Sequence, residues 1–313
     1  MATILITGGT GMIGRALTNA LLERNHRVII LTRRMPGMHY GSRVGYALWD
    51  TDKGTIDADA IAQTDCIVHL AGANVGEKRW TDQRKKEIIE SRVKSGELIV
   101  KALREMPNKV KAVISASAMG WYGPDPAIPN PKPFTEEDPA YDDFLGQTCV
   151  KWEQALEPVT HQGIRLVKLR TSIVLSKAGG ALKEFIKPLR FGFATILGSG
   201  KQVISWIHID DLVNLYISAI EKEEMTGVYN AATPKPVSNK ELILQVARSR
   251  NGGRFIAVRV PAFVLKLVLG EMSIEVLKST TLSCEKIKRA GFVFKYPTLE
   301  DLHNYFKPTG RRV

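Results

Sequence analysis

The segment ITGGTGMIGRAL, residues 6–17, decides the fold because spaced glycines lead from a short apolar strand, TILIT (3–7), into a helix. Gly8, Gly11 and Gly14 have GxxGxxG spacing. In such a turn the first glycine permits the tight bend, the second lets the backbone approach a pyrophosphate, and the third lets helix and strand pack closely. The amides and the positive dipole end of the helix then face the phosphates. We therefore predict dinucleotide binding by the backbone of Gly8, Thr10, Gly11, Met12, Ile13 and Gly14.

Runs typical of strands and of helices alternate after this turn. The β-branched runs are RVIILT (27–32), DCIVHLAG (65–72), KAVISAS (111–117) and IRLVKLRTSIVL (164–175). Helices are expected at about 12–24, 82–106 and 146–157. Short strands separated by longer helices indicate βαβ units, whose right-handed crossovers build a parallel sheet covered on both faces. The sequence predicts an α/β, doubly wound, Rossmann-like fold.

The alternation loosens after about residue 175, where the sequence favours a smaller and mostly helical region. We expect a dinucleotide-binding domain over 1–175, to which later segments return, and a substrate region with its C-terminal domain over 176–313. The stretch 123–140 holds six prolines and is predicted to be a surface loop.

The composition limits which classes of protein this chain can belong to. A chain of 313 residues that is 44% hydrophobic can bury a large core. Its three cysteines have no CxxC or Cys/His spacing, so neither a disulfide framework nor a metal site is expected. We expect a cytoplasmic protein that is not membrane-bound, because no basic leader or long apolar stretch occurs.

The formal net charge of +12 raises the question of a polyanionic partner. The basic groups are interleaved with Asp and Glu and lack aromatic stacking partners, which favours solvated helix faces. A positive field for an anionic ligand is the second interpretation. Nucleic-acid binding is the least favoured of the three and is not expected.

The second strand ends in Thr32, Arg33 and Arg34, where an NAD enzyme commonly places an acidic residue for the ribose 2′-hydroxyl. An arginine there can bind the 2′-phosphate of NADP through charge-assisted, bidentate hydrogen bonds. The sequence therefore favours NADP over NAD. The alternative is that these arginines are only surface residues at the end of a strand and bind no ligand.

The third strand continues into small residues that we expect to border the cofactor. Leu70, Ala71 and Gly72 are predicted to pass beneath it, where larger side chains would collide. His69 precedes them and is also placed in this cofactor-binding segment. As a lone histidine on an apolar strand, it is more simply a packed, hydrogen-bonded residue than a base.

Further motifs carry a resemblance to a known family. TGGTGMIG, VHLAG, SASAMGWYG and WIHIDDLV occur in the order found in extended short-chain dehydrogenase/reductases, the epimerase and dehydratase branch that acts largely on nucleotide sugars. KRWTDQRKKEIIESR, KWE, GSGKQVISWIHIDD and the tail VPAFVLKLVLGEMSIEVLKST resemble more closely the YfcH-like epimerase-family proteins, which end in a short domain of their own. The likeness spans nearly the whole chain.

The resemblance implies a catalytic Ser/Thr, Tyr and Lys. In the superfamily the tyrosine exchanges a proton with a substrate hydroxyl, while the lysine lowers its pKa and hydrogen-bonds the nicotinamide ribose. Ser117 matches the hydroxyl position and Lys151 the lysine, but Gln147 stands where the tyrosine is expected. Glutamine cannot titrate. By position, Arg92 is either a ligand of a cofactor phosphate or ribose or a solvated arginine.

Three interpretations follow. Tyr122 or Tyr141 supplies the proton; Ser117 and Lys151 perform a reduced chemistry; or the site binds NADP(H) without turnover. Tyr122 has a plain packing alternative beside Trp121. We expect an NADP(H)-dependent oxidoreductase or epimerase-like enzyme for a small polar substrate such as a nucleotide sugar, as a monomer or homodimer. The alternative is an NADP(H)-binding sensor or scaffold.

Overall fold

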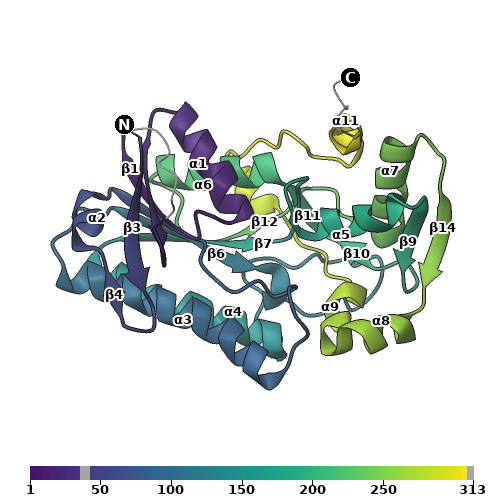
Figure 1. The fold of residues 1–313 in the computed structure, drawn as a ribbon, viewed down its shortest axis with the longest axis horizontal. Coiled ribbons are helices and arrows are strands. Elements are labelled where there is room, and N and C mark those ends of the chain that lie inside the picture. Colours follow the sequence, from purple (N-terminus) through teal and green to yellow (C-terminus); the bar gives the residue numbers. More distant parts are fainter. Residues whose placement is uncertain (36–42, 309–313) are drawn as a thin grey trace. The chain divides into compact units, whose positions relative to one another are not determined.

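The computed structural model describes residues 1–35 and 43–308, and its central element is an eight-stranded sheet (Figure 1). The strand order is β12-β7-β6-β5-β1-β2-β3-β4. The bounds are β1 Thr3–Thr7, β2 Arg27–Thr32, β3 Val44–Asp50, β4 Thr55–Ile56, β5 Cys66–His69, β6 Ala112–Ala118, β7 Arg165–Thr171 and β12 Gly227–Ala231. Neighbours from β7 to β3 pair in parallel, and β4 joins antiparallel to β3. The predicted parallel, doubly wound sheet is confirmed.

The strand order reverses at β1, because β2 and β3 follow on one side of it and β5, β6 and β7 on the other. In open sheets of this kind, ligands bind outside the carboxyl ends of the strands at such a switch point. The glycine-rich turn lies at the carboxyl end of β1, and the Leu70 to Gly72 segment follows β5. The topology therefore places both predicted cofactor segments at the same crevice.

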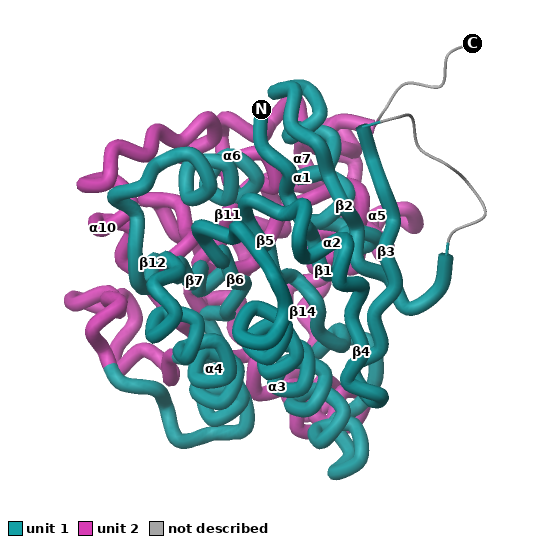
Figure 2. Tube along the Cα trace, turned by 90° about the vertical axis from the view of Figure 1, so that its left-hand side faces the viewer, with its two compact units in different colours: residues 1–121, 139–171, 212–229 teal, residues 122–138, 172–211, 230–313 magenta. Residues whose placement is uncertain are grey.

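Helices cover both faces of this sheet. They are α1 Met12–Glu23, α2 Ala58–Gln63, α3 Asp82–Glu105, α4 Phe144–Gln154 and α6 Ile209–Glu221, with 3-10 turns η1 Met119–Trp121 and η2 Glu157–Gln162. Figure 2 shows α3 and α4 on one face and α1 and α6 on the other. Thr81 caps α3 by accepting a hydrogen bond from the Arg84 N–H, and Asp143 caps α4 in the same way.

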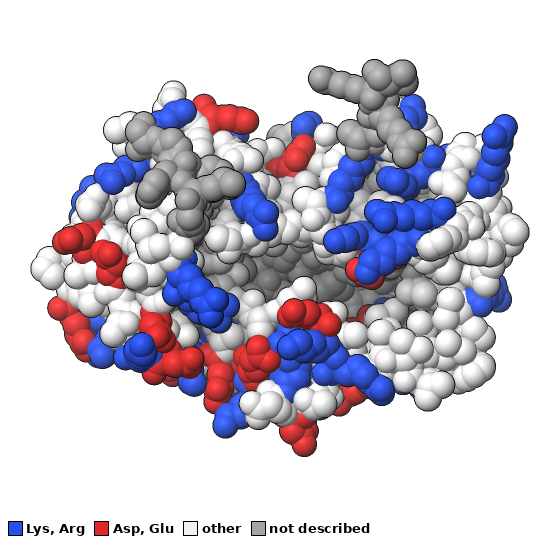
Figure 3. Space-filling view, in the orientation of Figure 1, with Lys and Arg blue, Asp and Glu red and all other residues white. Residues whose placement is uncertain are grey.

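The charged surface of α3 illustrates how the basic residues are distributed. Lys86 and Lys94 both pair with Glu90 one turn away, and Lys101 pairs with Glu105. Figure 3 shows Lys and Arg side chains beside Asp and Glu side chains over this helix. These cations are neutralised locally, as on an ordinary solvated helix face.

The chain forms two compact units (Figure 2). Unit 1 comprises residues 1–121, 139–171 and 212–229, and unit 2 comprises residues 122–138, 172–211 and 230–313. The predicted boundary near residue 175 lies close to one of the crossings between the units. The chain crosses several times, however, so no single boundary separates them.

Unit 2 combines short strands and helices around its own apolar core. Its elements are β8 Ile173–Leu175, β9 Phe193–Leu197, β10 Val203–Ile204, β11 Trp206–His208, β13 Val237–Ser238, β14 Ile256–Val260, α5 Gly180–Leu189, α7 Asn239–Asn251, α8 Ala262–Leu269, α9 Ser273–Leu277, α10 Glu285–Arg289, α11 His303–Phe306, η3 Gly270–Met272 and η4 Glu300–Leu302. Trp206, Leu242 and Phe306 are fully buried in this core. Across the described residues of both units, no helix has the length and apolar character needed to cross a membrane.

Candidate functional site

At positions 8 and 14 the turn between β1 and α1 has room for glycine only. Gly8 has a φ of +66°, in the left-handed region, and its carbonyl accepts a hydrogen bond from the Gly11 N–H at 3.0 Å. A Cβ on Gly14 would lie 2.5 Å from the Gly8 carbonyl oxygen, and one on Gly8 would lie 2.9 Å from the Leu70 backbone. Helix and strand therefore approach as closely as the motif predicts.

The first turn of α1 is suited to an anion. Gly11 provides no side-chain cap, and no acidic residue occurs in the first turn. The first backbone N–H groups of an uncapped helix have no intrahelical acceptor, and the helix dipole adds a partial positive charge. Arg15 Nε donates to the Thr10 carbonyl at 2.7 Å and so fixes the loop. This cradle fits a pyrophosphate.

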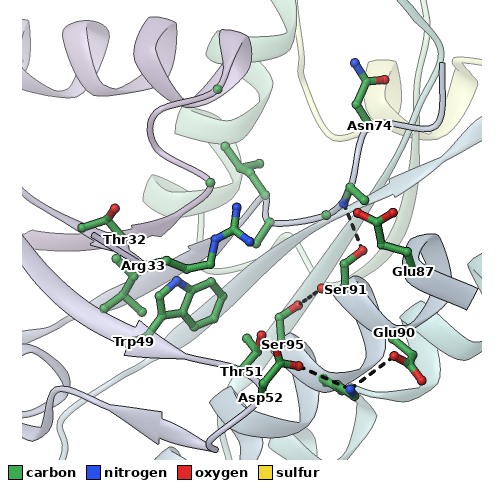
Figure 4. Close-up of a pocket in the computed structure, with 18 of the residues that line it drawn as sticks. Thr32, Arg33, Trp49, Thr51, Asp52, Asn74, Glu87, Glu90, Ser91 and Ser95 are labelled. Carbon is green, nitrogen blue, oxygen red and sulfur yellow. Dashed lines mark hydrogen bonds and ion pairs between the residues drawn. The ribbon is translucent and has the colours of Figure 1, made fainter. Parts of the chain in front are cut away.

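A cleft of about 1170 Å³ opens at this turn and lies within unit 1 (Figure 4). It exceeds the range of roughly 300–1,000 Å³ usual for small-molecule pockets and can accommodate an extended dinucleotide. Nine of the predicted cofactor residues line it: Gly8, Thr10, Gly11, Thr32, Arg33, Arg34, Leu70, Ala71 and Gly72. Met12, Ile13, Gly14, His69, Arg92 and Lys151 are not among its lining residues.

The end of β2 presents two arginines to this cleft. Thr32 Oγ1 donates to the Arg34 carbonyl at 2.8 Å and accepts from the Arg34 N–H at 3.3 Å, which shapes the turn. Arg33 and Arg34 are exposed, and neither forms an ion pair with any other described residue. Both guanidinium groups are thus available to an anionic group of a ligand.

Sequence reasoning missed the residues that follow the next strand. Trp49 and Asp50 end β3, Thr51 and Asp52 follow it, and all four line the same cleft. Figure 4 shows Trp49 at the end of the cleft where Thr32 and Arg33 lie. Asp52 Oδ1 lies 3.4 Å from Lys94 Nζ. The signal was the apolar run VGYALWD (44–50), which alternates too weakly to be recognised as a strand.

His69 supports the floor of the cleft from below. It is fully buried, and its ring nitrogens hydrogen-bond Thr7 Oγ1 at 2.8 Å and Ser95 Oγ at 3.2 Å. Burial, aided by the nearby charge of Arg92, lowers the pKa of His69 to about 3. The imidazole is therefore neutral at pH 7 and has the packed, hydrogen-bonded character that a lone strand histidine suggests.

Thr7 also fixes the segment that passes through the cleft. Its Oγ1 accepts from the N–H groups of Leu70 and Ala71 at 3.0 and 3.1 Å. Two residues after Ala71, the Ala73 N–H donates to Ser91 Oγ at 3.0 Å. Because β1 and α3 both hold this segment, it forms a rigid floor.

Arg92 lies behind this floor and is 8% exposed. Its Nη1 donates to the carbonyls of Ile88 at 2.9 Å and Ala73 at 3.2 Å. The guanidinium carbon lies 4.8 Å from the ring centroid of Trp152 and 3.1 Å from where a Cβ on Gly72 would stand. Burial lowers the pKa of Arg92 to about 10, so it stays charged at pH 7. The solvated alternative is wrong.

Lys151 lies on the outer face of α4. Its side chain is exposed and lines a second groove with residues of α3, of which Glu90 and Lys94 also line the cofactor cleft, but Lys151 itself does not line that cleft. Gln147, one turn earlier, is exposed as well and donates to Asp142 at 3.2 Å. This placement argues against the expectation that Lys151 holds the ribose, because the 147/151 pair faces away from the sheet.

The inward face of α4 carries different residues. Cys149 is 3% exposed, and its Sγ donates to the Ala118 carbonyl at 3.6 Å. Burial, and next the charge of Glu153, raises the pKa of Cys149 to about 12, so it stays protonated at pH 7. Four residues earlier, Leu145 packs against Gly120. The inward pair at the Tyr-x-x-x-Lys spacing is thus Leu145 and Cys149, and neither relays a proton near pH 7.

Ser117 belongs to a buried ionic network at the ends of β6 and β7. Its Oγ donates to Glu153 Oε1 at 2.7 Å, and Arg170 donates to both oxygens of the same carboxylate at 2.9 and 3.1 Å. Lys168 Nζ lies 3.7 Å from Glu153. The Arg170 guanidinium also stacks on Trp121, 3.5 Å from its ring centroid. Ser117 does not line the cleft, and its hydroxyl hydrogen is already committed.

Tyr122 belongs to unit 2 and is fully buried. Its hydroxyl donates to Asn230 Oδ1 at 2.7 Å, and its ring stacks on Phe134 with a centroid distance of 5.3 Å. Tyr122 therefore fits the packing alternative, because its hydroxyl is hydrogen-bonded to another residue of the protein. Tyr141, the other candidate, is 46% exposed, and neither tyrosine lines the cleft.

Comparisons with known proteins agree with this geometry. The sequence model of the NAD dependent epimerase/dehydratase family matches residues 4–232, and that of a domain of unknown function, DUF1731, matches residues 260–302. An epimerase family protein of Mycobacterium leprae is 32% identical over 305 residues, which cover 97% of this chain and 95% of that protein.

Two solved structures are also similar. The crystal structure of the human epimerase family protein SDR39U1 (isoform 2) with NADPH has 29% identity and a TM-score of 0.84, and the match covers 97% of this chain and 98% of that one. A nucleoside-diphosphate sugar epimerase from Corynebacterium glutamicum has 30% identity and a TM-score of 0.75, with 97% of this chain and 58% of that chain covered.

Proposed function

The chain belongs to the NAD-dependent epimerase/dehydratase family, and from that premise we propose that it is an NADP(H)-dependent, epimerase-like oxidoreductase for a small polar substrate. The family membership and the short C-terminal domain confirm the resemblance seen in the sequence. The observation that carries the choice of cofactor is the pair of exposed arginines at the end of β2, which form no ion pair with the described part of the chain.

Different residues of the cleft bind different parts of the cofactor. The amides of the β1–α1 turn bind the pyrophosphate, and Arg33 and Arg34 bind the 2′-phosphate through charge-assisted hydrogen bonds. The floor at Leu70 to Gly72 excludes water from one side of the cofactor. When bound, NADP(H) supplies hydride transfer. The human relative, crystallised with NADPH, supports this choice.

The substrate class is proposed from a second relative. The Corynebacterium glutamicum protein is described as a nucleoside-diphosphate sugar epimerase, which supports a nucleotide sugar as the substrate. No residue on the inward face of α4 gives the substrate oxygen a proton, so we propose that the proton comes from water or from a group outside this helix. Ser117, Lys151 and Tyr122 are therefore weak candidates for the reacting groups.

Label transfer tests this function. The protein is incubated with keto forms of nucleotide sugars and NADPH deuterated at C4 of the nicotinamide, and separately with the nucleotide sugars themselves and NADP⁺, and the products are analysed by mass spectrometry and chromatography. Deuterium in a product of the first reaction, or an epimerised sugar in the second, supports turnover. Cofactor binding without label transfer or epimerisation contradicts the enzymatic proposal.

A second candidate function is an NADP(H)-binding sensor that does not turn over. The specific observation in its favour is the inward pair Leu145 and Cys149, which replaces the proton relay with packing. The same experiment separates the two, because a sensor binds NADPH tightly and leaves its label in place.

A further inference from the structure

The superfamily supplies a positive charge to the nicotinamide half of its cofactor from a lysine on the helix that corresponds to α4. In this chain the inward face of α4 carries Cys149, Trp152 and Glu153, while Lys151 points outward. A cation nevertheless reaches this region from the neighbouring helix α3. It is Arg92, which packs over Trp152 and lies directly behind Gly72 in the floor of the cleft.

Arg92 is a buried cation that lies on the inward side of α3 and has no counter-charge within the described part of the chain. Among residues 1–35 and 43–308, no carboxylate forms an ion pair with it. Burying a charge is costly unless the charge is paired, so most buried cations have an anionic partner. An uncompensated arginine directly behind the floor of a cleft favours an anionic ligand in that cleft.

A second arginine on the same helix shows the contrast. Arg84 is 5% exposed, but its guanidinium pairs with Glu87 at 2.6 Å and with Glu77 at 3.2 Å. Its charge is compensated by the protein itself. The missing counter-charge is therefore particular to Arg92 and not a general feature of α3.

The position of Arg92 relates it to one half of the cofactor. A dinucleotide lies across the switch point of a doubly wound sheet. Arg33 marks the adenosine side, since it follows β2, whereas Gly72 follows β5 on the other side of β1. Figure 4 shows Arg33 and Asn74, two residues beyond Gly72, at opposite ends of the cleft. Arg92 thus lies under the nicotinamide half.

We propose that Arg92 replaces, from α3, the positive charge that superfamily members supply from a lysine on α4. This inference rests on the proposed NADP(H) site. Arg92 acts as a positioning residue through the Gly72–Ala73 backbone, which it holds by its hydrogen bond to the Ala73 carbonyl. Its charge attracts the cofactor phosphates and also disfavours the positively charged oxidised nicotinamide ring relative to the neutral reduced ring. The site is therefore selective for NADPH over NADP⁺.

Binding measurements on matched variants test this role. Dissociation constants for NADPH and NADP⁺ are measured by fluorescence and calorimetric titration for the wild type, Arg92→Gln, Arg92→Lys and Lys151→Gln. The last variant removes the same charge from the exposed face of α4 and serves as the control. Thermal unfolding of each variant checks that it folds.

We expect Arg92→Gln to bind NADPH about tenfold more weakly, the scale of one charge acting over a short distance in a partly buried site. The preference for NADPH over NADP⁺ should shrink at the same time, and Arg92→Lys should restore most of both effects. Lys151→Gln should leave both constants unchanged. Should Arg92→Gln fail to fold, Arg92→Met keeps the packing on Trp152 and takes its place.

Three results would overturn the inference: unchanged affinities in Arg92→Gln, a loss in Lys151→Gln as large as that in Arg92→Gln, or no rescue by Arg92→Lys. The last would indicate that only the shape of the guanidinium matters. Wild-type protein that binds neither form of the cofactor would refute the proposed function itself, and the inference with it.

Discussion

Replacing Gly14 with alanine tests whether the close contact of helix and turn is what binds the cofactor. The added methyl group would lie 2.5 Å from the Gly8 carbonyl oxygen, 2.6 Å from the Gly9 Cα and 2.8 Å from the Gly9 carbonyl carbon. All three are backbone atoms of the turn, so no flexible side chain can move aside. Either α1 or the turn must shift.

The size of this shift follows from the contact distances. Reaching a normal van der Waals separation requires a displacement of roughly 1 Å. Such overpacking typically costs about 1–3 kcal/mol of stability. The same displacement moves the α1 amides away from the phosphate position, and hydrogen bonds weaken steeply with poorer geometry. We expect Gly14→Ala to weaken NADPH binding by about tenfold or more, since the loss of one or two such bonds is worth about 1.5–3 kcal/mol.

Fluorescence titration with NADPH and thermal unfolding measure the two effects. Gly45→Ala is the matched control, because it adds the same methyl group on β3, where the nearest side-chain atom is 4.0 Å away. The control should bind NADPH like the wild type. Wild-type affinity and an unchanged melting temperature in Gly14→Ala would refute the view that this contact shapes the phosphate site.

Three further predictions concern single features of the site. The double variant Arg33→Gln/Arg34→Gln should lose the preference for NADPH over NADH, while its affinity for NADH stays unchanged. If titration shows that the variant still prefers NADPH, the two arginines do not bind the 2′-phosphate. His69 has a folded-state pKa of about 3, below its unfolded value, so only the unfolded state gains a proton as the pH falls below about 6.5. The free energy of unfolding of the wild type should therefore decrease by about 2 kcal/mol more between pH 7 and pH 5 than that of His69→Gln. Urea unfolding at both pH values measures this, and an equal decrease in the two proteins would disprove the prediction. Glu153→Ala leaves Arg170 buried without its carboxylate and should cost about 3–5 kcal/mol, whereas wild-type stability in denaturant unfolding would show that the network is not structural.

Much of the fold could be predicted because its signals are local. The glycine turn needs only short-range spacing to specify a strand, a tight bend and a helix, and the structure places it at the end of β1. The β-branched runs specify buried parallel strands for the same reason. The strand Val44–Asp50 was missed because its pattern is weak, and Trp49 and Asp52 were missed with it.

The catalytic assignments were harder because they depend on rotation and on distant partners. Lys151 was assigned because it matches the lysine of the family motif. A helix turns about 100° per residue, however, at 3.6 residues per turn, so Cys149 two positions earlier faces nearly the opposite way. The apolar spacing of Leu145, Cys149 and Trp152 contained this information and favours them as the inward face. The packing role of Tyr122 could not be predicted from its neighbours in the sequence, because its hydrogen-bond partner Asn230 lies 108 positions away.

Under the proposed function, the cleft keeps the cofactor-binding part of the superfamily site but has different residues at the reacting part. Pyrophosphate binding depends on backbone geometry, which glycines alone secure, so it survives wherever the turn survives. Proton transfer instead needs a titratable group near pH 7, and α4 offers a leucine and a thiol whose pKa is raised to about 12 by burial. We propose that the cation for the polyanionic cofactor comes instead from α3, where Arg92 has no counter-charge among the described residues. Arg92 and Cys149 both keep their protonation state near pH 7, so we expect the charge of the proposed NADP(H) site to stay constant across neutral pH.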